Sequence, residues 1–134
     1  MIVVDTNVIA YLCLRAERCE QARRALQKDP KWVAPFLWRS EFRSALTLYV
    51  RKRRITLAEA QERMDESLRL MSGRERDVNS AHVLRLAAQS DCTAYDCEFV
   101  ALAEDLNVRL VTVDKQILAE FPNVAIALDK FVTA

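Results

Sequence analysis

Residues 93–114, TAYDCEFVALAEDLNVRLVTVD, show the pattern of a helix, a turn and an apolar strand. Thr93 and Asp96 have the spacing of a capping box, and the apolar residues behind them favour a helix that ends near Asn107. Residues 108–113 are largely β-branched and nearly uncharged, which is typical of a buried strand. Asp114 follows directly. The stretch therefore predicts a helix–strand unit with one carboxylate at the start of the helix and another just after the strand.

Asp96 has a structural interpretation as well as a functional one. The helix dipole stabilises an acidic residue in the first turn by about 0.3–1 kcal/mol. At 100° per residue, however, Asp96 lies nearly opposite Glu98 and Asp105, the two acids that we expect to mark the solvent face. A capping role alone does not require that orientation, so Asp96 is a candidate for a second role.

The rest of the chain alternates between short apolar strands and amphipathic helices. Further strands are expected at 2–4, 32–34 and 124–128, and further helices near 6–13, 17–28, 36–53, 57–71, 80–89 and 115–121. The only glycine, Gly73, breaks the chain before a charged loop. This alternation predicts an α/β fold in a single domain, residues 1–134, with a mostly parallel sheet covered by helices on both faces.

Composition and charge exclude several classes of protein. The formal net charge of +1 argues against binding nucleic acid through bulk charge, although a local basic patch remains possible. There is no signal-peptide pattern and no apolar run of about 18 residues, so we expect a cytoplasmic protein without a membrane span. The four cysteines, which lack zinc-finger spacing, are interpreted as packed thiols of the core in a reducing compartment: Cys13, Cys19, Cys92 and Cys97.

Three further acids stand at unusual positions. Asp5 ends the first strand as Asp114 ends a later one, and ligands of parallel sheets collect at such carboxyl ends. Glu41 lies on an apolar helix stripe together with Ala45 and Leu48. Because burying an unpaired carboxylate costs several kcal/mol, Glu41 at a core-facing position requires a cation, a metal or protonation.

Taken singly, these acids can be explained by helix caps at Asp5, Asp96 and Asp114 and by a buried ion pair at Glu41. If they converge, ionised carboxylates about 4 Å apart repel by about 1–4 kcal/mol per pair, and a hard divalent cation offsets that repulsion. Oxygen ligands favour Mg²⁺ or Mn²⁺, which retain water that can attack a phosphorus. The four acids together therefore predict metal-dependent cleavage of phosphodiesters, by one or two ions.

Four motifs also resemble a known family. They are VVDTNVI at 3–9, RSEFRSAL at 39–46, the stretch 93–114 and KQIL at 115–118. Together, at this spacing and over essentially the whole chain, they resemble the PIN-domain ribonucleases, especially the VapC-type toxins of toxin–antitoxin pairs.

The resemblance carries several expectations. It implies a three-layer α/β/α fold, Mg²⁺- or Mn²⁺-dependent cleavage of RNA, homodimers and inhibition by a cognate antitoxin. It places the catalytic and metal-binding acids at Asp5, Glu41, Asp96 and Asp114, with supporting polar residues at Thr6, Asn7 and Thr112. The chain departs from the family pattern at Asp91, Cys92 and Cys97, where smaller residues are more usual.

Several basic residues are candidates for contacts with an RNA backbone. The densest run is Arg51, Lys52, Arg53 and Arg54, and Arg39 and Arg43 flank Glu41. A solvated helix end explains the run equally well, because cations suit the helix dipole there. Tyr95 could stack on a base but is expected to be structural, and a single histidine, His82, disfavours a metal-free nuclease that needs two.

Three other functions remain open at this stage. A non-toxin RNA-processing nuclease of the same fold would share the acids. An aspartyl-phosphate phosphatase would need a second aspartate where Asn7 stands and a lysine, for which only Lys115 is available. A non-catalytic binding module would use the acids only as helix caps.

Overall fold

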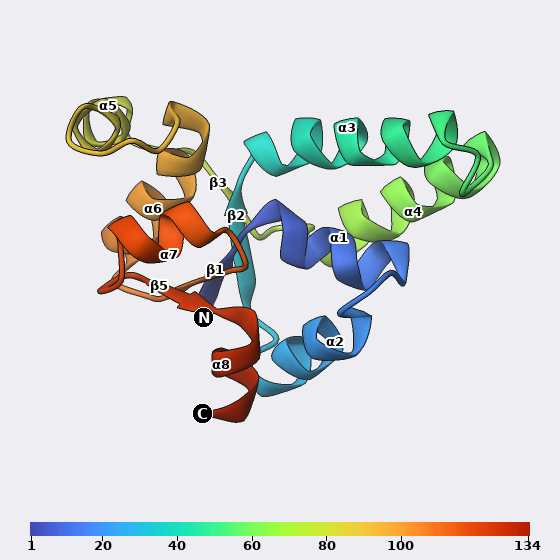
Figure 1. The fold of residues 1–134 in the computed structure, drawn as a ribbon, viewed down its shortest axis with the longest axis horizontal. Helices are drawn as coiled ribbons and strands as arrows, with labels where there is room; N and C mark the ends of the chain where they lie inside the picture. Colours follow the sequence, from blue (N-terminus) through green and yellow to red (C-terminus); the bar gives the residue numbers. More distant parts are fainter.

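The computed structural model describes residues 1–134 and contains a five-stranded, all-parallel sheet in the order β3-β2-β1-β4-β5 (Figure 1). The strands are β1 (Ile2–Val4), β2 (Trp32–Pro35), β3 (Glu75–Arg76), β4 (Leu110–Thr112) and β5 (Ala125–Ala127). The helices are α1 (Thr6–Leu14), α2 (Cys19–Lys28), α3 (Leu37–Arg51), α4 (Leu57–Leu70), α5 (Ser80–Ala88), α6 (Ala94–Leu106), α7 (Lys115–Glu120) and α8 (Leu128–Thr133).

Helices cover both faces of this sheet, as predicted. In Figure 1, α5, α6 and α7 lie on one side, and α1 to α4 lie on the other. Helix α6 packs against β1, β2 and β4, with α5 outside it, while α1 contacts β4, α2, α3 and α4. The predicted three-layer α/β/α arrangement is therefore confirmed.

The central strand β1 fixes the edge at which the acids gather. Its three residues are buried and pair in parallel with β2 and β4, with Val3 opposite both Val33 and Leu110. Because all neighbours are parallel, β1 and β4 end at the same edge of the sheet. Asp5 follows β1 directly and Asp114 comes two residues after the last residue of β4.

Two short elements were not predicted. Strand β3 has only two residues, both charged, and it pairs Glu75 with Ala34 of β2. Hydrophobic periodicity gives no signal for so short a polar strand. Helix α8 begins at Leu128, which we had expected to end a strand, so β5 is shorter than predicted.

The core-facing stripe of α3 was predicted wrongly. Its buried residues are Trp38, Phe42 and Leu46, whereas Leu48, which we had placed on the buried stripe, is 51% exposed. The helix carries two adjacent apolar stripes, and the one with the larger aromatic side chains occupies the core. The free energy gained on burial is roughly proportional to the apolar area buried, so this stripe gains more. Glu41 lies beside this core rather than within it.

Most of the cysteines lie in the core, as interpreted from the sequence. Cys13, Cys92 and Cys97 are buried, whereas Cys19 is only partly buried, and all four are free thiols. Burial is the main cause that raises the pKa of Cys13 to about 11 and that of Cys92 to about 12. None of the helices combines the length and apolarity needed to cross a bilayer.

Candidate metal centre

Asp5 is held where β1 passes into α1. Its Oδ1 accepts the Thr6 backbone N–H at 2.8 Å as the N-cap of α1, and its Oδ2 accepts the Thr112 hydroxyl at 2.6 Å. Asp5 is only 9% exposed. Asp5 therefore caps α1 through Oδ1, as the structural interpretation has it. Its Oδ2 is held by Thr112 of β4, a contact that capping does not require.

Thr112 connects two of the acids. Its Oγ1 donates to Asp5 and accepts the backbone N–H of Asp114 at 3.0 Å. Asp114 in turn caps α7, since its Oδ1 accepts the N–H groups of Gln116 and Ile117 at 2.9 and 3.0 Å. One buried hydroxyl thus sets the position of Asp5 relative to the turn that carries Asp114.

Glu41 projects from α3 toward α1 and accepts the Thr6 hydroxyl at 2.7 Å. Glu41 forms no salt bridge, so the buried ion pair considered for it is not observed, and the Thr6 hydroxyl is its hydrogen-bond donor instead. Burial raises the pKa of Glu41, and the carboxylates of Asp96 and Glu98 raise it further. Glu98 was wrongly assigned to the solvent face, because it is partly buried, and burial raises its own pKa.

Asp96 forms the predicted capping box at the start of α6. Its backbone N–H donates to Thr93 Oγ1 at 3.1 Å, and its Oδ2 accepts the Thr93 N–H at 3.4 Å. The loop before α6 is braced by Glu120, whose carboxylate accepts the N–H of Asp91 at 2.9 Å and the thiol of Cys92 at 3.2 Å. Two residues at which the chain departs from the family pattern thus tie α6 to α7.

All four acids line one cavity of about 340 Å³, together with Thr6 and Asn7. Burial raises the pKa of Asp5 to about 6, although hydrogen bonds from Thr112 and Thr6 oppose the rise, and the carboxylates of Glu41 and Asp96 add to it. The cavity therefore concentrates negative charge in a place where water screens it poorly.

The donor atoms fit a hard cation with retained waters. Asn7 Oδ1 is buried and has no hydrogen-bond partner, while Asn7 Nδ2 lies 3.5 Å from Asp5 Oδ2. A buried amide oxygen without a partner is costly, and a cation or its water would satisfy it. No three or more histidine, cysteine, aspartate or glutamate side chains lie close enough together to hold a metal ion by themselves. Mg²⁺ commonly binds through one or two carboxylates and several waters, so an open site suits it.

Comparison with known proteins places this fold and cavity in a family. A model of the PIN domain matches residues 2–125. The chain belongs to the PIN-domain family. The PIN-domain chain is also 32% identical over 126 residues to Ribonuclease VapC3 from Pyrobaculum aerophilum, an alignment that covers 90% of this chain and 95% of that protein.

Solved structures share the fold of this PIN domain. PAE2754 from Pyrobaculum aerophilum has a TM-score of 0.79 at 22% identity, with 98% of this chain and 93% of that chain covered. FitAcB from Neisseria gonorrhoeae has a TM-score of 0.73 at 20% identity, with coverage of 95% and 96%. FitAB bound to an IR36 DNA fragment has a TM-score of 0.70 at 22% identity, with coverage of 96% and 95%.

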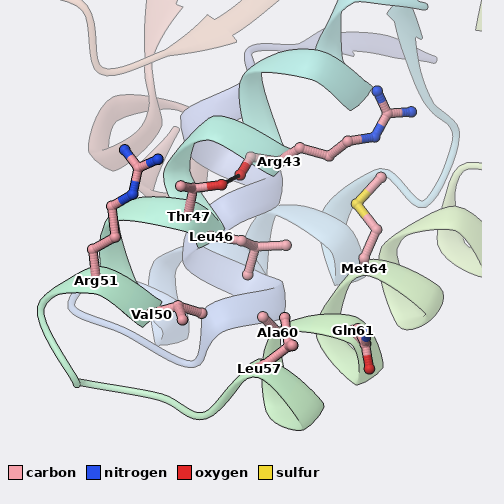
Figure 2. A pocket seen from close by; sticks show the side chains of 9 residues that line it. All are labelled: Arg43, Leu46, Thr47, Val50, Arg51, Leu57, Ala60, Gln61 and Met64. Atoms are coloured by element: carbon pink, nitrogen blue, oxygen red, sulfur yellow. Dashed lines mark hydrogen bonds between the residues drawn. The ribbon is translucent and has the colours of Figure 1, made fainter.

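None of the six basic residues proposed for RNA lines the acid-lined cavity. Arg39 forms a bidentate pair with Glu75, with both nitrogen–oxygen distances at 2.5 Å, so its charge is already neutralised. Arg43 and Arg51 line a separate apolar groove between α3 and α4 (Figure 2). Lys52 and Arg53 are exposed at the turn after α3. Of the six, only Arg54 contacts a residue that lines the acid-lined cavity, Tyr49.

Sequence reasoning missed the other half of the cavity. Its remaining lining residues come from α1 and α3 and are mostly apolar or aromatic: Ala10, Tyr11, Leu14, Ala45 and Tyr49. Helical spacing indicates that the tyrosines share a helix face with the polar site residues, because Tyr11 follows Asn7 by four residues and Tyr49 follows Glu41 by eight. Tyr95, expected to be structural, is 63% exposed and does not line the cavity.

Two further residues bear on the alternatives. His82 lies 3.3 Å from Glu104 and 2.9 Å from Asp105, so it joins α5 to α6 and does not line the acid-lined cavity. Lys115, the only lysine that a phosphatase mechanism had available, is exposed and does not line the cavity either. The cavity therefore lacks the cation that an aspartyl-phosphate mechanism needs.

Proposed function

We propose that this PIN domain is a metal-dependent endoribonuclease and acts as the toxin of a toxin–antitoxin pair. The observation that carries the proposal is the single cavity lined by Asp5, Glu41, Asp96 and Asp114. The 32% identity to Ribonuclease VapC3 supports RNA as the substrate. A charge-dense acidic cavity is an unfavourable place for a phosphodiester unless a cation neutralises it.

The acids of this cavity would hold Mg²⁺ or Mn²⁺, with waters completing its coordination, and the bound ion would supply an activated water and neutralise charge on the phosphate. The chain's own residues prepare the cavity for that ion. The hydroxyl of Thr112 donates a hydrogen bond to Asp5, and the hydroxyl of Thr6 donates one to Glu41, so each carboxylate is held in a fixed orientation. Asn7 presents a buried amide oxygen that has no partner in the protein.

The proposal also includes protein partners, which are suggested by the relatives of this chain. FitAcB and FitAB, the latter bound to DNA, have the same fold as this chain. We include a cognate antitoxin in the proposal on this ground, and a homodimeric assembly because the family resemblance of the sequence implies it. A non-toxin RNA-processing nuclease remains the second candidate, since the same cavity would serve it.

Asp96→Asn tests the chemistry, with Asp105→Asn as the matched control on the same helix. Asparagine keeps an acceptor oxygen for the Thr93 N–H of the capping box, so the variant should stay folded, lose Mn²⁺ binding by paramagnetic resonance and stop cleaving RNA. Asp105 is exposed and outside the cavity, so its variant should cleave RNA normally. Products should carry 5′-phosphate and 3′-hydroxyl ends. Cyclic phosphate ends, or full activity in Asp96→Asn, would refute the proposal.

Expression in a bacterial host separates the two candidates. If the protein is a toxin, expression of the wild-type chain should arrest growth, and expression of Asp96→Asn should not. Co-expression of a small DNA-binding protein encoded directly upstream should relieve the arrest. Normal growth during expression of a chain that cleaves RNA in vitro would favour the processing nuclease.

A further inference from the structure

The acid-lined cavity continues as an aromatic cleft between α1 and α3. We define the cleft by Ala10, Tyr11 and Leu14 of α1 and by Ala45 and Tyr49 of α3, which line the same cavity as the acids. Both tyrosines are partly buried. The proposed chemistry uses none of these residues, although they make up nearly half of the lining.

The cleft has a direction. In Figure 1, α1 and α3 leave the same edge of the sheet and run side by side, and the two helices are in contact. Glu41, Ala45 and Tyr49 follow one another at intervals of four residues along α3. At 1.5 Å per residue, Tyr49 stands about 12 Å beyond Glu41 along the helix. The acids therefore occupy one end of the cleft and the tyrosines the other.

Arginines stand over both tyrosines at the far end. The guanidinium carbon of Arg18 lies 5.8 Å from the centre of the Tyr11 ring, and that of Arg54 lies 5.8 Å from the centre of the Tyr49 ring. Arg18 caps α2 after the turn that leaves α1, and Arg54 lies in the turn that leaves α3. Both arginines are exposed, so each combines a contact to an aromatic ring with access to solvent.

We infer that this cleft binds single-stranded RNA next to the scissile phosphate, with Tyr11 and Tyr49 stacking on bases and Arg18 and Arg54 contacting the backbone. The inference rests on the proposed ribonuclease function and adds the path of the substrate to it. Aromatic rings along a positively charged channel are the usual platform for single strands, because every base has a stackable face.

The charge pattern favours RNA over a peptide as the occupant. A polyanion can place one phosphate at the cation-neutralised acids and a neighbouring one at Arg18 and Arg54. An apolar peptide has a more suitable surface in the groove of Leu46, Val50 and Leu57 between α3 and α4 (Figure 2). Double-stranded RNA is excluded from stacking on the rings because its bases are paired and stacked on one another.

The stacking role is tested with a short RNA that contains 2-aminopurine, in Ca²⁺ in place of Mn²⁺, so that a divalent cation neutralises the acids while cleavage is kept slow. Tyr49→Leu should bind about tenfold more weakly and lose the quenching of 2-aminopurine, while Tyr49→Phe should keep both. Phe131→Leu is the matched control, because Lys28 stands 4.8 Å from the centre of the Phe131 ring outside the cleft. In Mn²⁺, Tyr49→Leu should raise KM for the same oligonucleotide more than it lowers kcat.

Substitution of the two exposed arginines tests the proposed backbone contacts independently, through the salt dependence of RNA affinity, and it leaves the core unchanged. Arg18→Gln and Arg54→Gln should each flatten the dependence of log affinity on log salt by about 0.7, the value for one phosphate contact with a single strand. Lys130→Gln, which changes an exposed cation outside the cleft, should leave the slope unchanged.

The outcomes separate this inference from the proposed function. A wild-type chain that cleaves RNA, together with unchanged affinity and quenching in Tyr11→Leu and Tyr49→Leu, overturns the RNA path and leaves the cleft to a protein partner. A wild-type chain that neither binds nor cleaves RNA overturns the ribonuclease function itself. Unchanged salt slopes in both arginine variants also contradict the proposed path.

Discussion

Asp5→Asn should make the metal-free protein more stable at neutral pH while it removes stabilisation by metal. Burial, opposed in part by hydrogen bonds, raises the pKa of Asp5 from 3.8 to about 6. The folded protein therefore holds a proton to higher pH than the unfolded chain does. Below pH 4 the side chain is mostly protonated in both states and costs little. Between pH 4 and about 6 the folded state progressively loses stability relative to the unfolded chain, and above that range the loss is constant.

The magnitude follows from the size of that pKa rise. It corresponds to about 3 kcal/mol of lost stability above pH 7, since one pKa unit is 1.36 kcal/mol. Asparagine keeps an acceptor for the Thr6 N–H but weakens the contact from the Thr112 hydroxyl, which offsets about 1 kcal/mol. The net gain is about 2 kcal/mol, or roughly 6–10 °C in Tm for a chain of this length.

Calorimetric melting in EDTA between pH 4 and 8 measures this effect. The wild-type protein should lose stability across that range relative to Asp5→Asn, and the two curves should meet near pH 4. Adding Mn²⁺ at pH 7.5 should raise the Tm of the wild type and leave the variant unchanged. Asp29→Asn is the control, because its carboxylate pairs with the N-terminal ammonium of Met1 away from the cavity. Parallel pH curves for wild type and Asp5→Asn would refute the reasoning.

Three further predictions concern the supports of the site. Thr112→Val removes the hydroxyl between Asp5 and Asp114, so Mn²⁺ binding measured by paramagnetic resonance should weaken about tenfold, while Thr112→Ser should bind normally. Glu120→Gln loosens the brace before α6, so hydrogen exchange should speed up at the Asp91 amide and stay unchanged in α8. Phe42→Ala should lower the free energy of unfolding in urea by about 3–5 kcal/mol, whereas Leu48→Ala should change it by less than about 0.5 kcal/mol. Equal losses from both would contradict the orientation of α3.

The positions of Asp5 and Asp114 could be predicted because they depend on strand direction. A parallel sheet brings the ends of neighbouring strands to one edge, whatever the details of packing. Asp96 could be predicted because a capping box fixes its place in the first turn. The PIN-family assignment and the three-layer fold are both confirmed.

The surroundings of Glu41 were harder to predict. Two apolar stripes on α3 compete for the core, and helical spacing alone does not distinguish them, because they differ in apolar area: the stripe of Trp38 and Phe42 is the larger and is buried. The partner of Glu41, the Thr6 hydroxyl, lies 35 residues away and has no periodic signal. Strand β3 escaped prediction for a similar reason, since the pairing of Glu75 with Ala34 is purely tertiary.

The tyrosine end of the cavity shows a different limit. Tyr11 and Tyr49 fall in two separate predicted helices, and only the contact between α1 and α3 places them in one cavity. Spacing within a helix shows which residues share a face, but the facing of two helices is a property of the folded chain.

Three of the four acids also stabilise the start of a helix: Asp5 and Asp114 are the N-caps of α1 and α7, and Asp96 completes the capping box of Thr93 in α6. Asparagine caps a helix about as well as aspartate does, and at position 96 it keeps an acceptor oxygen for the Thr93 N–H. A single conservative exchange at any of these positions should therefore silence the proposed nuclease and leave a folded protein with its outer surface intact. A single point mutation is therefore enough to produce an inactive variant of this chain. Such a variant would still compete with the active protein for any partner that recognises the outer surface.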